Sequence, residues 1–367
     1  MVSSRSRETS ETIICISYFA VLGAWNVALR IFVYELVCGG GWLGYRPCEI
    51  PPASLAREGA AMLTALAADF AAIDGVQVMA LRDARFASIE LPRCEVVEVV
   101  SADDEQALFR RLAHGADWTV VIAPETDGIL AARCRAVEHE RGRLLGPSPA
   151  LVDVASDKVR TASRLLAAGI PVPEGVPLEA SEPLPTCFPY PAVMKRRDAA
   201  GSQDMRLIAE ARGQAPYRAR LERYIAGVPA SVAFLCGPHG EIALPACHQR
   251  LSNDGTFSYL GGSLPLEDEM ARRATRLAAR ALRCLGPTLG YLGVDLVLAK
   301  DPDGRRDVVI EINPRLTTSY VGLRAAARHN LAAALLAVAS GCRADLSFTG
   351  EMIEFTADGN VCGVVHR

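Results

Sequence analysis

Hydrophobic and polar positions follow two alternating patterns in the first 150 residues. Apolar runs of strand length occupy residues 30–37, 76–81, 95–100 and 119–123. Apolar positions recur at helical spacing over residues 54–70, 103–113 and 126–139. Ser101 is a candidate N-cap for the second of these helices. Strands that alternate with helices indicate a parallel sheet with crossover helices, so we predict an α/β domain ending near Pro147-Ser148-Pro149.

The pattern changes in the second half of the chain. Helices are predicted at residues 157–168, 267–285 and 321–339. Strand and hairpin signals follow a Pro-rich connector at 171–191, and two further strands flank the turn sequence Asp301–Gly304. The tail after Gly341 is expected to add one strand. This mixture indicates an α+β organisation.

The first 28 residues allow three interpretations. Arg5 and Arg7 precede an uncharged run at residues 12–29, which superficially resembles a signal peptide or membrane anchor. No small-residue cleavage site stands out, however, and the run continues into the first predicted strand. We favour a dispensable extension, or a misassigned start with Val27 as the initiator, over an anchor.

Composition excludes several classes of protein. The formal net charge is -3, with 39 basic and 42 acidic residues among 367, so no electrostatic footprint for nucleic acid is present. The 11 cysteines include no C-x-x-C pair, which predicts neither disulfides nor zinc but buried thiols in a reducing cytoplasm. G-x-S-x-G, P-loop and H-E-x-x-H motifs are absent.

The strongest chemical signal is a predicted hairpin made of residues 290–298 and 308–315. A hairpin symmetric about Asp303 places Asp295 opposite Glu311, with Asn313 on the same face. Two carboxylates about 5 Å apart repel by roughly 3 kcal/mol at an effective dielectric near 20, which a hard cation would relieve. The apolar neighbours are expected to fill the opposite face and fix the register: Val294, Leu296, Ile310 and Ile312. The alternative is an exposed hairpin whose acids are solvated.

Two lysines and one hairpin complete the pattern. Lys158 begins a helix, where the dipole disfavours a cation unless it reaches an anion. Lys195 ends an apolar strand, and the loop Asp198–Asp204 after it, with Gly201 and Ser202, can fold over phosphates. The segment 221–231 is predicted as strand, turn and strand, where an adenine could pair with the backbone of residues 223–225.

In this order and spacing, the three segments resemble the ATP-grasp superfamily. The resemblance implies a Rossmann-like pre-ATP-grasp domain at residues 29–147, an ATP-grasp domain at 148–345 with a lid subdomain at about 180–225, and a tail at 346–367. It assigns ATP contacts to Lys158, Lys195, Gly201, Ser202, Glu222, Arg223, Tyr224 and Ile225. It assigns Mg²⁺, which Mn²⁺ could replace, to Asp295, Glu311 and Asn313. Lys195 and Arg315 would be catalytic. Pro229 stands where many relatives have a ribose-binding acid, a contact that Glu222 could supply.

A narrower resemblance involves residues 33–41, 57–62 and 311–320, which are similar to the tyramine–glutamate ligase group of methanofuran and methylofuran biosynthesis. It implies an amide ligase that joins a carboxylate, such as that of glutamate, to an amine through an acyl phosphate. Substrate contacts are expected at Arg250, Gly39, Gly40 and Thr317, with His248 as a lining residue rather than a base. The partners would be small molecules, neither nucleic acid nor membrane, and a homodimer is compatible with the family. Two alternatives stay open: an ATP-grasp enzyme with another substrate, and a non-catalytic ATP-binding module.

Overall fold

The N-terminal part of the chain forms a four-stranded parallel sheet. The computed structural model describes residues 28–47, 49–199, 204–301 and 303–364. The strands are β1 (Leu29–Glu35), β2 (Val76–Asp83), β3 (Cys94–Val99) and β4 (Trp118–Ile122). Their order is β3-β2-β1-β4, and all neighbours run parallel, as the alternating pattern predicted.

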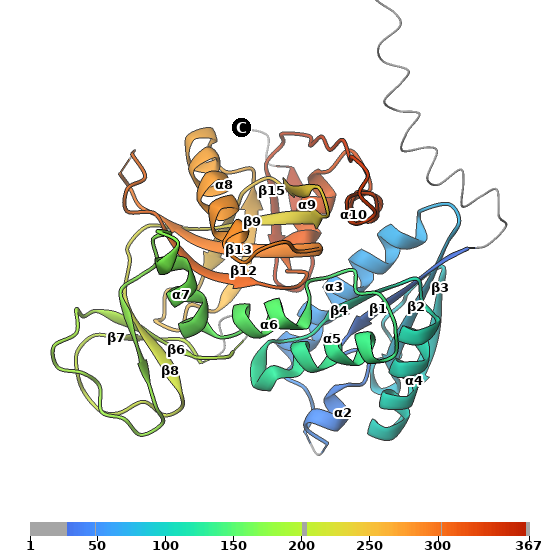
Figure 1. Cartoon of the computed structure of the whole chain (residues 1–367), viewed down its shortest axis with the longest axis horizontal. Helices are drawn as coiled ribbons and strands as arrows, with labels where there is room; N and C mark the ends of the chain where they lie inside the picture. The colour runs from blue at the N-terminus through green and yellow to red at the C-terminus, as the bar shows by residue number, and fades with distance from the viewer. Residues whose placement is uncertain (1–27, 48, 200–203, 302, 365–367) are drawn as a thin grey trace, which may run out of the picture.

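Helices cover both faces of this sheet (Figure 1). Ile31 and Val33 pack against the helix α3 (Ala53–Ala71), whereas Phe32 and Tyr34 face α4 (Ala102–Gly115) and α5 (Ile129–His139). This follows from the two-residue alternation of side chains along β1. Three short elements complete the domain: α2 (Trp42–Tyr45) and two 3-10 turns at Ala84–Phe86 and Thr126–Gly128. The predicted N-cap is confirmed, since the Ser101 hydroxyl accepts from the Asp104 N–H at 3.2 Å.

A small antiparallel sheet forms a separate lobe at the far left of Figure 1. Two helices lead to it, α6 (Pro149–Ala155) and α7 (Lys158–Ala167). Its strands are β5 (Gly175–Leu178), β6 (Ala192–Arg196), β7 (Arg206–Ile208) and β8 (Ala219–Arg223), in the order β5-β8-β6-β7. The lobe has its own apolar cluster, which includes Met194 and Leu221.

The C-terminal part is built on an eight-stranded antiparallel sheet with the order β14-β13-β9-β11-β12-β15-β16, and β10 pairs with β9. Its strands are β9 (Val228–Gly237), β10 (Gly240–Ala243), β11 (Cys247–Leu251), β12 (Tyr259–Leu264), β13 (Gly290–Leu298), β14 (Val308–Asn313), β15 (Ile353–Thr356) and β16 (Val361–Val364). The helix α8 (Asp268–Arg283) packs on one face. On the other face α9 (Ser319–Ala326) and α10 (Leu331–Ala339) share a core with α3, so this cluster joins the two large domains.

Three predictions need correction. The helix expected at 321–339 is two helices, because the Asn330 side chain caps a new helix by accepting from the Ala333 N–H at 3.0 Å. The tail adds two strands rather than one, and β15 pairs with β12 inside the main sheet. Of the described cysteines, all free thiols, only Cys38, Cys134, Cys236 and Cys247 are buried.

The predicted N-terminal extension lies outside the described residues, apart from its last position. Within the ranges that the structure does describe, no helix combines the length and apolar character needed to cross a membrane.

Candidate active site between the lid and the main sheet

The acidic hairpin has the register expected from the sequence. Asp295 of β13 pairs with Glu311 of β14, and Asn313 lies two residues further along the same strand. The pairing shifts between Asp295 and Leu296, which leaves Ile310 without a partner of its own. Ile310 therefore lines the neighbouring cavity instead of joining the core with Val294, Leu296 and Ile312, which corrects the predicted pattern.

Amide side chains hold the Asp295 carboxylate. Asn313 Nδ2 donates to Asp295 Oδ2 at 3.0 Å, and Gln249 Nε2 of β11 donates to Oδ1 at 2.9 Å. Burial, together with the charge of Glu311, raises the pKa of Asp295 to about 7. Burial raises the pKa of Glu311, but the charges of Lys158 and Lys195 lower it further, so Asp295 is the less well compensated of the two acids.

Lys158 approaches this face from the start of α7. The side chain of Asp157 caps the helix by accepting from the N–H groups of Val159 and Arg160. Lys158 Nζ then lies 3.2 Å from Glu311 Oε2 and donates to the Ala199 carbonyl at 2.6 Å. Burial lowers the pKa of Lys158, but Glu311 together with the charges of Glu125 and Glu222 outweighs it, and the net shift is upward. The prediction that Lys158 reaches an anion is therefore confirmed, and the anion is the carboxylate of Glu311.

Lys195 is buried at the end of β6 in the lid. Its Nζ lies 2.6 Å from Glu222 Oε2, and Arg220 Nε donates to Glu222 Oε1 at 2.8 Å. Both oxygens of Glu222 are therefore engaged by cations. This arrangement does not favour Glu222 as the ribose contact suggested in place of Pro229, although both residues line the same cavity.

That cavity, of about 140 Å³, lies between the lid and the main sheet. The segment 222–225 lines it, opposite Ile310 and Val297, and Tyr224 stacks on Phe257 with ring centroids 6.2 Å apart. The N–H groups of Arg223 and Tyr224 already donate to the carbonyls of Glu174 and Pro191. Among the backbone donors of residues 223–225, only that of Ile225 is left for an adenine.

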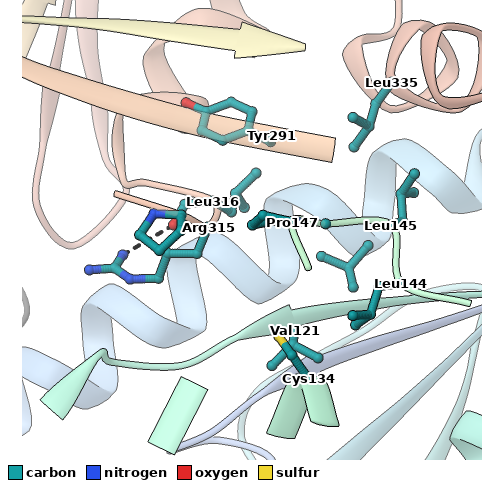
Figure 2. Close-up of a pocket in the computed structure, with 12 residues that line it drawn as sticks. Val121, Cys134, Leu144, Leu145, Pro147, Tyr291, Arg315, Leu316 and Leu335 are labelled. Carbon is teal, nitrogen blue, oxygen red and sulfur yellow. Dashed lines mark hydrogen bonds between the residues drawn. The ribbon is translucent and has the colours of Figure 1, made fainter. Parts of the chain in front are cut away.

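A second cavity, of about 760 Å³, adjoins the first and shares Asp295 and Glu311 with it. Arg315 projects into it from the segment after β14. Arg315 Nε donates to Glu125 Oε1 of the N-terminal domain at 3.0 Å. In Figure 2 Arg315 and Leu316 lie at the seam between the domains, with Pro147 beside them and Val121 of the N-terminal sheet beyond. The arginine is thus tied to the N-terminal domain while it belongs to the C-terminal part of the chain.

Comparisons with known proteins agree with this geometry. A pre ATP-grasp 3 domain model matches residues 76–152, and an ATP-grasp domain model matches residues 155–319. The chain belongs to the ATP-grasp superfamily. A tyramine–L-glutamate ligase from Methanocaldococcus jannaschii is 24% identical over 307 residues, which cover 83% of this chain and 89% of that relative.

Solved ATP-grasp structures share the fold. A superfamily protein from Archaeoglobus fulgidus matches with a TM-score of 0.69 and 24% identity, covering 89% of this chain and 92% of its own. The ADP complex of an N5-carboxyaminoimidazole ribonucleotide synthetase matches with a TM-score of 0.64 and 16% identity, covering 90% of this chain and 81% of its own. The chain is accordingly an ATP-dependent, ADP-forming ligase of the ATP-grasp type that joins a carboxylate to an amine.

The donor set on the ATP-grasp hairpin fits a magnesium ion. Mg²⁺ is usually bound by one or two carboxylates together with substrate phosphates and water. Asp295, Glu311 and the Asn313 amide supply such oxygens on one face. In the described ranges, no group of three or more His, Cys, Asp or Glu side chains is placed to hold a metal ion.

Some predicted residues are not brought to the site. Gly39 and Gly40 are buried inside the N-terminal domain, where an added Cβ would strike the Glu35 carbonyl oxygen and Val99 respectively. Arg250 is exposed, because it alternates with Gln249 along β11 and so points away from Asp295. Thr317 does line the larger cavity.

Gly201 and Ser202 lie outside the described residues. Their neighbour Ala199 is buried beside Lys158.

Sequence reasoning missed three side chains that the fold places at the cleft. Gln249 lies between His248 and Arg250, which were expected at the substrate, but its position two strands from Asp295 could not be predicted from spacing. Glu125 follows β4 at the carboxyl edge of the parallel sheet, where ligands commonly bind. Glu58 lies in a motif quoted for family resemblance, but nothing in the motif indicated which way it points.

Proposed function

We propose that this ATP-grasp ligase joins the carboxylate of L-glutamate to an amine related to tyramine, in the biosynthesis of a methanofuran-type cofactor. The observation that carries the proposal is the pair of adjoining cavities that share Asp295 and Glu311. One is narrow and lined by the hinge of the lid, which suits a nucleotide. The other is large enough for two small substrates beside the phosphates. The name of the M. jannaschii relative supplies the substrates.

The residues divide into three groups under this proposal. Lys158 and Lys195, with Gly201 and Ser202 of the lid loop, would hold the ATP phosphates, and residues 222–225 would hold the adenine. Asp295, Glu311 and Asn313 would bind Mg²⁺ or Mn²⁺. Arg315 would bind the substrate carboxylate as it becomes an acyl phosphate, since a guanidinium forms two parallel hydrogen bonds with such a group.

The chemistry requires positioning and charge neutralisation rather than a protein nucleophile. A carboxylate oxygen of glutamate attacks the γ-phosphorus, and ADP leaves. The ammonium group of the amine first gives up a proton, and the neutral nitrogen then attacks the acyl carbon. The amide bond forms, phosphate leaves with the electron pair of the broken C–O bond, and the second proton of the nitrogen passes to the leaving phosphate or to water. Bound Mg²⁺ would neutralise charge on the phosphates during transfer. Lys158 would exchange Glu311 for a phosphate oxygen when the nucleotide enters.

The test is ADP release from purified protein with ATP, Mg²⁺ and L-glutamate against a panel of amines, tyramine first. We expect ADP only when both an acid and an amine are present. Glu311→Gln removes one metal carboxylate and the anion facing Lys158, and we expect kcat to fall at least about 100-fold. Glu138→Gln is the matched control, because Glu138 is exposed on α5 away from the cleft.

Several outcomes would contradict the proposal. Turnover with another acid and amine would refute the substrate assignment and leave the ligase. ATP binding without ADP release under every pairing would support the non-catalytic alternative. Full activity in Glu311→Gln would remove the metal site from the mechanism.

A further inference from the structure

Glu58 is a carboxylate of the larger cavity that forms no direct ion pair among the described residues, although its charge contributes, after that of Glu125, to the raised pKa of Arg315. It is half-buried on α3, in the N-terminal domain, and lines the cavity together with Arg315 and Thr318 of the other domain. Thr318 Oγ1 donates to Glu58 Oε1 at 2.5 Å. Across the described ranges, no Lys, Arg or His lies within 4.0 Å of Glu58 as an ion-pair partner.

Each of the other carboxylates at the cleft has hydrogen-bond or ion-pair partners of its own. Glu311 faces Lys158, and Glu125 faces Arg315. Asp295 receives two amide N–H groups and would share the metal. A cavity carboxylate that lacks a direct ion pair still has an oxygen free to accept a charge-assisted hydrogen bond from a cationic ligand.

The packing of α3 fixes Glu58 in this place. The next residue, Gly59, lies so close to β1 that an added Cβ would be 2.6 Å from the Glu35 carboxyl carbon. This contact sets the depth of the helix against the sheet and leaves Glu58 directed to the opposite domain. The side chain thus comes from a rigid element rather than from a loop.

The surroundings of Glu58 are apolar and aromatic on one side. Leu55 of the same helix and Tyr259 and Leu260 of β12 line the same cavity. Burial raises the pKa of the Tyr259 phenol well above its ordinary value, so this hydroxyl stays protonated and can donate. An apolar body with one cationic end matches this wall better than an amino acid with two carboxylates.

We propose that Glu58 binds the ammonium group of the acceptor amine and selects primary amines with an apolar body. This inference rests on the proposed ligase function and assigns each substrate to one charged residue of the cavity. Arg315, whose positive charge repels an ammonium, lines the same cavity and would hold the acid. Tyr259 and Leu260 would contact the body of the amine.

The test separates the two half-reactions of the ligase. Hydroxylamine is small and largely uncharged at neutral pH, and it traps an acyl phosphate as a hydroxamate without needing an ammonium site. We expect Glu58→Gln to raise KM for the amine about 10- to 100-fold, the equivalent of losing one charge-assisted hydrogen bond. The KM values for ATP and for the acid, and the rate of hydroxamate formation, should stay within about threefold of the wild type.

Three results would overturn the inference. Loss of hydroxamate formation in Glu58→Gln would show that Glu58 serves the acid or the phosphoryl transfer. A rise in KM for the acid alone would place the amino group of the acid at Glu58. An unchanged KM for the amine would leave Glu58 without a role in binding.

Two controls keep these results interpretable. Glu58→Asp retains the charge, and its KM for the amine should lie between those of the wild type and Glu58→Gln. Thermal unfolding should show that both variants fold. If the wild-type protein forms no hydroxamate with any acid, the proposed function fails and this inference with it.

Discussion

Several buried charges in this protein are paired with an opposite charge. Lys195 and Glu222 are each less than 5% exposed, and Arg220 completes a buried triad with them. A buried pair loses stability when one partner is removed, because the remaining charge has neither water nor a counterion. The buried triad of the lid therefore contains Lys195, the same cation that would bind the phosphates of the nucleotide.

Glu35 is a buried acid that the cleft does not use. It accepts from the Cys38 N–H at 2.7 Å, and burial raises its pKa to about 7. An acid whose pKa is higher in the folded state than in the unfolded state holds its proton more tightly when the protein is folded. Its contribution to stability is fully present at pH values below the unfolded-state pKa and is lost as the pH rises through the folded-state pKa. Between about pH 4.5 and pH 7, Glu35 should therefore cost the protein roughly 3 kcal/mol of unfolding free energy.

Glu35→Gln should remove this dependence. We expect wild-type stability to fall more steeply than that of Glu35→Gln as pH rises from 4.5 to 7.5, measured by urea unfolding at several pH values. Other acids with a raised pKa, Asp295 among them, titrate in both proteins. Their effects on the free energy of unfolding therefore largely cancel when the two pH curves are compared. Parallel curves for the two proteins would mean that Glu35 titrates normally.

At the scale of elements, two departures from regular structure shape the site. The bulge between Asp295 and Leu296 turns Ile310 toward the nucleotide cavity while keeping Asp295 opposite Glu311. The break between α9 and α10 lets the chain run on to a second helix that packs on β9. Each departure changes the part of the structure against which apolar side chains such as Ile310 are placed.

Asn330 makes the break between these helices. Its side-chain oxygen caps α10, and its Nδ2 donates to the Asp69 carbonyl at 2.7 Å. Asn330→Ala should cost about 1 to 2 kcal/mol of unfolding free energy, because both bonds are lost. Asn330→Asp keeps the cap and should recover part of that loss. Equal stability of both variants to the wild type in urea would contradict this role.

At the scale of the whole molecule, α3 holds the two large domains in register (Figure 1). Asp69 of α3 is paired with Arg324 of α9, and Tyr320 donates to Asp69 Oδ2 at 2.7 Å. The same helix carries Glu58 to the cleft. Domain alignment and substrate contact thus depend on one helix.

Asp69→Asn should weaken this junction. We expect a loss of about 2 kcal/mol in urea unfolding and a rise in KM for both substrates, since Glu58 and Arg315 would no longer be held at a fixed separation. Asp74→Asn is the control, because Asp74 is exposed just beyond the same helix. A loss of stability with unchanged kinetics would show that the junction does not position the site.

The sequence by itself determined most elements and the centre of the site. Alternation along β13 and β14 placed Asp295, Glu311 and Asn313 on one face, and the position of Lys158 against a helix dipole indicated an anion. These are local consequences of two-residue and 3.6-residue periodicity, which act within one element or one hairpin. The resemblance to the ATP-grasp superfamily assigned these same residues to the binding of ATP and magnesium.

Only the tertiary structure decided which distant residues join them. Gln249, Glu125 and Glu58 reach the cleft from a strand, a loop and a helix that are far from the hairpin in sequence, and Gly39, Gly40 and Arg250 do not reach it. Sheet order and helix packing set these contacts, and neither is encoded in the spacing of one segment. The bulge at Asp295 escaped prediction for the same reason, whereas the cap at Asn330 is a local hydrogen bond to the Ala333 N–H that the sequence could have indicated.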